Sequence, residues 1–226
     1  MMKLNLNDIK KSYDVIVSLG SSCSPAMQLR RHNLRRFSGP LDWSVSLTLS
    51  DVSRLLKNKF DGFMEIKNMR LLEETHFFLD EGVAVLPRDG STQPIKSYFV
   101  KDTYYNILSV HDFPILPNQD WSATYPSYKE KLNYRINRFL EKITNSQSVL
   151  FVRWKASYDE AIELQSVLSE IVNGHFNILI LHPVDGSQGV SEMNWGLDKV
   201  CSVKVPNDTN DNSTWDFVLN GITLNN

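Results

Sequence analysis

Residues 127–205 alternate between helix-like and strand-like patterns, and this alternation constrains the fold more than any other feature of the sequence. Two segments carry apolar side chains at helical spacing, and three short apolar runs lie between and after them: helices are predicted at 127–144 and 159–172, and strands at 149–154, 176–182 and 200–205. A strand, helix, strand succession predicts a parallel sheet flanked by helices, with right-handed crossovers. We therefore expect an α/β fold with a largely parallel, three-layer sheet, formed by one domain over residues 1–226.

The stretch 14–31 predicts a buried strand, a tight turn and the start of a helix. Three β-branched residues and Leu19 form the strand at 15–19, and Gly20 permits the turn. Ser22 or Ser24 can cap the following helix, in which Pro25 occupies the first turn. Cys23 therefore lies at a helix N-terminus, where free N–H groups and the helix dipole are expected to lower the pKa of its thiol.

Between these two regions the pattern is less regular. We expect a helix at 50–59 capped by Ser50, a small antiparallel, β-rich insertion at 63–101, and a strand at 104–114 that carries His111 and Asp112 near its end. The C-terminal part predicts a polar loop at 207–214 and a short helix at 215–221.

Composition excludes several classes of function. The 226 residues carry 24 basic and 26 acidic side chains, so the net charge of −2 gives no general attraction to nucleic acid or to a membrane. No apolar run approaches the length of a membrane span, and the N-terminus lacks the apolar core of a signal peptide, so a cytoplasmic protein is expected. Two cysteines suggest free thiols, with Cys201 in the core. No cluster has metal-ligand spacing, and neither a metal nor a cofactor is expected.

Polar groups follow several predicted strands and would meet at one rim if those strands were parallel neighbours. The first strand leads into Gly20–Cys23, the second carries His111 and Asp112, the third carries Arg153, and the fourth ends at His182. This set suits nucleophilic catalysis: Cys23 attacks a carbonyl, and His111, or His182 as the alternative, takes and returns the proton. Backbone N–H groups of the turn formed by Gly20, Ser21, Ser22, Cys23 and Ser24 would hold the oxyanion.

The group that orients the histidine stays open. Asp112 is a candidate, although adjacent residues of an extended strand point to opposite faces, so a bend would be needed to bring its carboxylate onto His111. Asp120, Asn194 and Asp198 are further candidates.

Two other functions fit the same residues. In the first, the Gly20–Ser24 turn of a noncatalytic module would cradle an anionic ligand such as a phosphorylated sugar, aided by Arg153 or Arg30. In the second, the chain is a structural partner of a larger enzyme. The arginines at 30, 31, 35 and 36 are interpreted as a solvated helix face in preference to a phosphate or carboxylate site. The partner is expected to be a small-molecule or peptide substrate of unknown identity.

Several of these motifs together resemble the bacterial family DUF1796, described as putative papain-like cysteine peptidases. The resemblance covers roughly residues 12–205 and rests on Ser18-Leu-Gly-Ser-Ser-Cys23 with Gln28-Leu-Arg-Arg31, Ser38-Gly-Pro-Leu-Asp-Trp43, Leu108-Ser-Val-His-Asp-Phe-Pro114, and Arg138-Phe-Leu with Val149-Leu-Phe-Val-Arg153. It implies a cysteine-nucleophile enzyme with Cys23 and His111 as its catalytic pair.

The layout departs from that of papain-like proteases, which carry a Cys-Gly-Ser-Cys-Trp pattern where this sequence has Gly20-Ser-Ser-Cys-Ser24, and which place the cysteine helix against an antiparallel barrel. An apolar strand precedes Cys23, where those proteases place a glutamine for the oxyanion. A strand, a Gly-Ser turn and a nucleophile that opens a helix look more like the SGNH hydrolases, with cysteine in place of serine. The expected parallel sheet is therefore Rossmann-like or SGNH-like.

Overall fold

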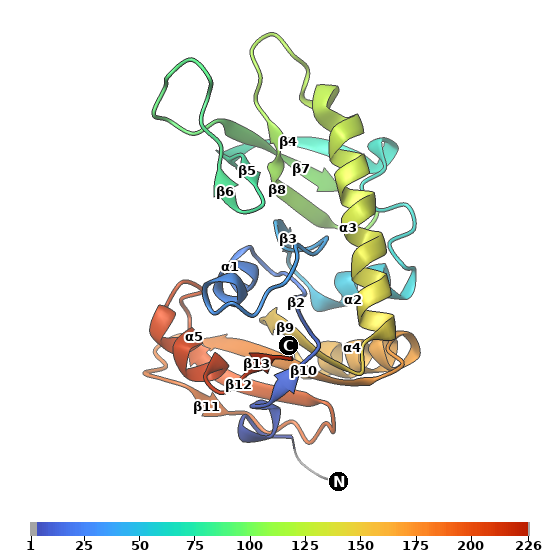
Figure 1. Ribbon diagram of the computed structural model, residues 1–226, viewed down its shortest axis with the longest axis vertical. Helices are drawn as coiled ribbons and strands as arrows, with labels where there is room; N and C mark the ends of the chain where they lie inside the picture. Colours follow the sequence, from blue (N-terminus) through green and yellow to red (C-terminus); the bar gives the residue numbers. More distant parts are fainter. Residues whose placement is uncertain (1–3, 226) are drawn as a thin grey trace.

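The computed structural model describes residues 4–225 and shows a mixed α/β protein (Figure 1). The helices are α1 Ser24–Arg31, α2 Leu49–Lys57, α3 Tyr125–Asn145, α4 Tyr158–Ile171 and α5 Asn212–Leu219, with short 3-10 turns at Asn7–Ile9, Ile66–Asn68 and Trp121–Thr124. The strands are β1 Ser12–Tyr13, β2 Val15–Ser18, β3 Ser44–Ser46, β4 Met69–Phe77, β5 Leu79–Asp80, β6 Val83–Ala84, β7 Lys96–Asp102, β8 Ile107–Pro114, β9 Ser148–Trp154, β10 His175–Val184, β11 Ser191–Glu192, β12 Val200–Pro206 and β13 Thr223–Leu224.

One sheet contains the strands expected to be parallel. Its order is β11-β12-β10-β9-β2, in which β2, β9, β10 and β12 pair in parallel and the short edge strand β11 is antiparallel. Helix α4 connects β9 to β10, as the alternating pattern predicts. All four parallel strands are rich in buried apolar side chains, because helices or other chain segments cover both faces.

A second sheet is antiparallel, and it contains the strand that carries His111. Its order is β3-β8-β7-β4, and the separate pairs β5-β6 and β1-β13 complete the strands of the described residues. The expectation of one largely parallel, three-layer sheet is therefore not confirmed. The assumed parallel direction of the His111 strand is wrong, because β8 pairs with β7 through a short turn and with β3, both antiparallel.

Helix ends differ from the expected ones where another side chain supplies the cap. Thr48, and not Ser50, caps α2 by accepting a hydrogen bond from the Asp51 N–H. Asp211 caps α5, so this helix starts at Asn212, inside the segment expected to be a loop. Pro25 lies in the first turn of α1 as predicted, but the cap residue is Cys23, whose side chain makes no capping hydrogen bond.

Two apolar clusters cover the two faces of the parallel sheet. On one face, α1 and α5 pack over a cluster that includes Leu150 and the buried Cys201, which confirms the expected core position of that cysteine. On the other face, α2, α3 and α4 and part of the antiparallel sheet share one cluster, in which Phe151 and Phe113 both lie. Helix α3 runs along one side of the molecule from the antiparallel sheet to the parallel sheet (Figure 1).

No helix within residues 4–225 has the length and apolar character needed to cross a membrane.

Candidate functional site

The turn after β2 has positive φ angles and packs closely against neighbouring segments. Gly20 has φ +76°, and a Cβ atom there would lie 3.3 Å from the Leu41 carbonyl oxygen. Ser21 also has a positive φ, 82°. It is fixed by a pair of hydrogen bonds with Ser46: the Ser21 N–H donates to Ser46 Oγ at 3.2 Å, and the Ser46 N–H donates to the Ser21 carbonyl at 3.3 Å. The turn therefore presents Cys23 at a defined place.

Arg153 stabilises this turn from the protein interior and does not face the edge of the sheet where a ligand was expected. Its Nη1 donates to the Leu19 carbonyl at 2.9 Å and to Ser46 Oγ at 2.6 Å, and its Nη2 donates to the Ser46 carbonyl at 2.9 Å. The side chain is buried, with 1% relative exposure, and burial lowers the pKa of Arg153 to about 10. The expected role of Arg153 in binding an anion is corrected to a structural one, because its donors are directed at the protein.

The Cys23 thiol is less acidic than a free thiol. Burial, followed by the carboxylates of Asp112 and Asp42, raises the pKa of Cys23 to about 12, and the N–H of Cys23 itself opposes this shift only in part. The expectation of a lowered pKa is wrong, because desolvation and two nearby negative charges outweigh the helix terminus.

Some N–H groups of the turn are engaged and others are free. Gly20 N–H donates to Ser18 Oγ, Ser21 N–H to Ser46 Oγ, and Ser24 N–H to Ser22 Oγ. Among residues 4–225, no acceptor takes the N–H of Ser22 or of Cys23. Of the turn residues expected to bind an oxyanion, these two keep their donors available.

A bulge in β8 sets the positions of His111 and Asp112. Ser109 pairs with Val100 and Phe113 with Tyr98, so residues 110–112 lie opposite the single residue Phe99. Bulges of this kind change the direction of side chains and are common beside active sites.

The His111 ring is oriented by a backbone carbonyl. Its Nδ1 lies 2.7 Å from the Phe77 carbonyl oxygen, and its ring meets those of His76 and Trp43 edge-on. Because a carbonyl only accepts, Nδ1 carries the hydrogen and Nε2 is the basic nitrogen of the neutral ring. Burial, with a smaller effect of His76, lowers the pKa of His111, so the ring is neutral near pH 7.

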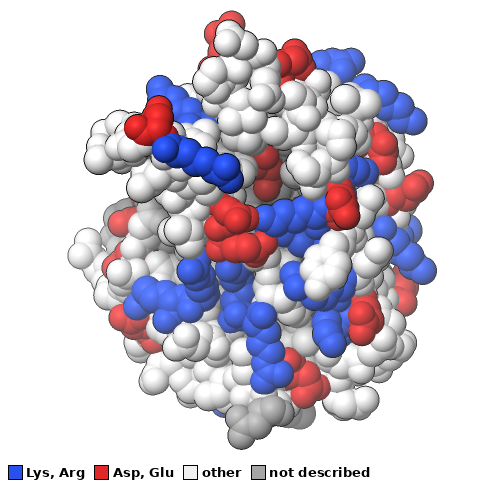
Figure 2. All heavy atoms as spheres, turned by 45° about the horizontal axis from the view of Figure 1, so that its top comes forward, with Lys and Arg blue, Asp and Glu red and all other residues white. Residues whose placement is uncertain are grey.

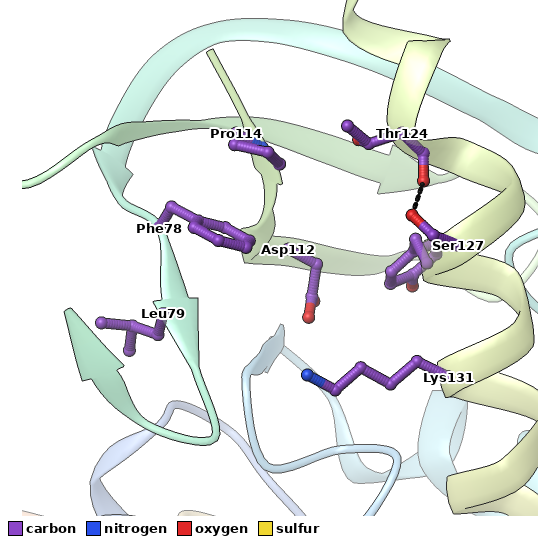
Figure 3. A pocket seen from close by; sticks show the side chains of 8 residues that line it. Phe78, Leu79, Asp112, Pro114, Thr124, Ser127 and Lys131 are labelled. Carbon is purple, nitrogen blue, oxygen red and sulfur yellow. Dashed lines mark hydrogen bonds between the residues drawn. The ribbon is translucent and has the colours of Figure 1, made fainter. Parts of the chain in front are cut away.

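Asp112 does not orient His111. Its carboxylate accepts a hydrogen bond from Ser109 Oγ at 2.6 Å and lies 3.7 Å from Arg135 Nη1. Burial raises the pKa of Asp112, against the effect of Arg135. The Asp112 side chain lines a pocket of about 200 Å³, which Lys131 enters from α3 (Figure 3). The pocket is lined by Phe78, Leu79, Asp112, Pro114, Thr124, Ser127, Tyr128 and Lys131.

Two ion pairs lie near these residues, one buried and the other partly exposed. Arg35 Nη1 lies 2.6 Å from the Asp42 carboxylate, which also accepts the Gly39 N–H. Arg135 Nη2 lies 2.7 Å from Glu81, in the turn between β5 and β6. On the face drawn in Figure 2, acidic side chains lie between groups of Lys and Arg.

His182 lies elsewhere in the parallel sheet. Its Nδ1 is 2.9 Å from the Ala156 carbonyl, and its ring lies edge-on to Trp195. None of these contacts involves the turn that contains Cys23. Asp120 caps a 3-10 turn by accepting from Ser122 and is exposed.

Sequence reasoning missed the ion pairs, although one signal was present. Positions 128, 132, 135 and 139 share one face of α3, so Arg135 interrupts an apolar stripe and must be buried with a partner. The pairing of Arg35 with Asp42 depends on the intervening Gly39-Pro40 turn and has no comparable periodic signal.

No group of three or more His, Cys, Asp or Glu side chains among residues 4–225 is arranged to hold a metal ion.

Comparisons with known proteins agree with the motifs. The model of a family described as "Putative papain-like cysteine peptidase (DUF1796)" matches residues 14–184. The chain is also similar to "Uncharacterized protein R408" of Acanthamoeba polyphaga mimivirus, with 29% identity over 189 residues that cover 77% of this chain and 81% of the viral protein. This relative is viral, so it does not support the expected bacterial origin. No solved structure matches the chain.

Proposed function

Because this chain belongs to the DUF1796 family, described as putative papain-like cysteine peptidases, we propose that it is a hydrolase or acyl transferase that uses Cys23 as its nucleophile. One observation carries the proposal: Ser46 of β3 exchanges hydrogen bonds with Ser21, in the turn that leads to Cys23, and β3 pairs with β8, whose bulge carries His111. The negative charge of Asp112, which lies in that bulge, also raises the pKa of Cys23, although Cys23 follows a strand of the other sheet. The bulge also carries His111, and so supports the pairing of a thiol with an imidazole.

The raised pKa of Cys23 determines the order of proton transfer in this proposal. The resting residue is a neutral thiol, so Nε2 of His111 accepts the Sγ proton while Sγ forms a bond to the substrate carbonyl carbon. The free N–H groups of Ser22 and Cys23 stabilise the oxyanion. The bond between the carbonyl carbon and the leaving group then breaks as the imidazolium gives its proton to the leaving group. Water or an acceptor, deprotonated by His111, attacks the acyl carbon, and the carbon–sulfur bond breaks as the imidazolium returns the proton to Sγ.

A nitrophenyl ester tests the proposal without knowledge of the natural substrate. With p-nitrophenyl acetate we expect a burst of nitrophenol and an added acetyl mass on the peptide that contains Cys23. Cys23→Ala should abolish the acetyl adduct, and His111→Ala should slow acylation by about 10²-fold or more. His182→Ala is the matched control and should leave the rate within about twofold. An equal rate in Cys23→Ala, or a larger loss in His182→Ala than in His111→Ala, would refute the assignment.

A noncatalytic module that binds a phosphorylated sugar at the Gly20–Ser24 turn has less support. Asp42 and Asp112 place negative charge near the turn, and Arg153 is committed to backbone and Ser46 oxygens. Both features disfavour an anionic ligand there.

A further inference from the structure

A second pocket lies beside the C-terminal end of α1, away from the helix start that holds Cys23. It has a volume of about 290 Å³ and is lined by Arg30, Arg35, Arg36, Phe37, Ser38 and Glu81. The tip of the β5-β6 hairpin forms part of its wall, where Arg30 Nη1 donates to the Glu81 carbonyl at 3.0 Å. Three guanidinium groups therefore share a small space with one carboxylate.

Two of the pocket's charged groups, Arg35 and Glu81, already have partners of opposite charge. The Asp42 carboxylate lies 2.6 Å from Arg35 Nη1. Glu81 is paired with residues outside the pocket, with Arg135 at 2.7 Å and Lys131 at 3.5 Å. Its carboxylate also accepts a hydrogen bond from Ser38. The local charges of Arg35 and Glu81 are therefore balanced by these partners.

Arg30 and Arg36 keep their positive charges. Arg30 contacts the Glu81 carbonyl and Arg36 contacts the Asn225 carbonyl, both of which are neutral. Within residues 4–225, neither guanidinium forms an ion pair with a carboxylate. Both side chains are exposed, so solvent and small ligands can reach them.

We propose that this pocket binds the phosphoryl group of a small phosphorylated ligand. A phosphoryl group carries between about one and a half and two negative charges near pH 7. It therefore balances the charges of Arg30 and Arg36, which pair with no carboxylate within residues 4–225, better than a carboxylate with its single charge does. A guanidinium group can also bind a phosphate through two parallel N–H···O hydrogen bonds. The half-buried Phe37 ring, with Arg138 stacked 4.9 Å from its centre, offers an apolar wall for the rest of the ligand.

None of the residues of the Gly20–Ser24 turn lines this pocket, and binding there does not depend on catalysis by Cys23. It assigns to Arg30 and Arg36 a role other than that of a solvated helix face.

Calorimetric titration with inorganic phosphate tests the proposal, with ionic strength held constant by sodium chloride. We expect saturable, single-site binding to the wild-type protein, and at least tenfold weaker binding after the paired substitutions Arg30→Gln and Arg36→Gln. Arg88→Gln removes an exposed arginine outside the pocket and is the matched control, expected to bind as the wild type does. Sulfate, also a dianion, should compete with phosphate, and acetate at the same concentration should not.

Several outcomes would overturn the proposal. One is the absence of any heat of binding in the wild type up to about 10 mM phosphate. Another is a dissociation constant for phosphate that the paired substitutions leave unchanged, or that Arg88→Gln weakens equally. The last is competition by acetate as strong as that by sulfate. Circular dichroism of each variant before titration verifies that it is folded.

Discussion

At Cys23, the N-terminal end of α1 and the carboxylates of Asp42 and Asp112 act on the same sulfur in opposite directions. The helix terminus favours the thiolate, whereas burial and the two negative charges favour the neutral thiol. The second effect is larger, because a helix terminus contributes less than desolvation does in a crowded site.

The first prediction concerns the pH dependence of Cys23 alkylation. With iodoacetamide, followed by mass spectrometry of the Cys23 peptide, the rate should keep rising above pH 9, since burial and both carboxylates raise the pKa of this thiol to about 12. Asp112→Asn removes one of these charges and should lower the apparent pKa. Asp120→Asn, at an exposed position, is the control. A wild-type midpoint at or below about 8.5, the value of a free thiol, would contradict the structure.

The bulge in β8 determines the hydrogen-bond partners of His111 and Asp112. Both lie in the bulge at 110–112, where His111 bonds to the Phe77 carbonyl and Asp112 accepts a hydrogen bond from Ser109. The histidine is therefore oriented by the backbone of β4. The sequence around His111 does not predict this contact.

At the scale of the element, the β5-β6 hairpin depends on the ion pairs at its tip. Its two turn residues, Glu81 and Gly82, both have positive φ angles, 49° and 81°, as a type I′ turn requires. This conformation is unfavourable for glutamate by about 1–2 kcal/mol. The contacts of Glu81 with Arg135, Lys131 and Ser38 offset that cost.

The second prediction is that Glu81 stabilises the fold only while it is ionised. Despite its partial burial, hydrogen bonds from Ser38 and Arg135 lower the pKa of Glu81 from 4.5 to about 2. Its contribution is therefore complete above pH 4.5 and is lost as the pH falls toward 2. Because half of the side chain is exposed, Glu81→Gln should lower the free energy of unfolding at pH 6 by only about 1 kcal/mol.

Urea unfolding of wild type and Glu81→Gln at pH 6, 4 and 3 measures this effect. The difference between the two proteins should shrink as the pH decreases. Asp89→Asn, in an exposed loop, should show no such trend. A difference that is the same at pH 6 and pH 3 would rule out the ion pairs as its source.

At the scale of the whole molecule, α3 joins the two sheets. Its buried face contributes Phe139 to an apolar cluster that contains residues of both sheets, and the Phe139 ring packs edge-on against Phe60, with centroids 5.7 Å apart. A shared core of this kind couples the unfolding of its parts.

The third prediction is a single unfolding transition that depends on this shared core. Tryptophan fluorescence and circular dichroism should give the same urea midpoint, and Phe139→Ala should lower both together, at a cost of about 3–5 kcal/mol. Tyr134→Ala, on the exposed side of the same helix, is the control and should cost less than about 1 kcal/mol. Two separate midpoints would show instead that the sheets unfold independently, and would refute the expected single domain.

Periodicity predicts most of the elements because it records burial along a single segment. The apolar face of α3 and the apolar runs of β2, β9, β10 and β12 are visible in the sequence for this reason. The caps at Thr48 and Asp211 were missed because several polar residues near each helix start can accept the same N–H groups.

The candidate site was only partly predictable. The turn at Gly20 and the position of Cys23 at the start of α1 follow from local sequence, because only a few residues determine them. The partner of β8, the bulge around His111 and the burial of Arg153 and Arg135 depend on segments that are far apart in the chain.

The sequence by itself thus determined the strand, the glycine turn and the helix that present Cys23, together with the family to which the chain belongs. Only the tertiary structure decided that β8 lies in an antiparallel sheet, that Arg153 is a support, and that the Cys23 thiol is neutral at rest. The physical reason is that local backbone preferences act over a few residues, whereas desolvation and charge pairing depend on which distant segments become neighbours.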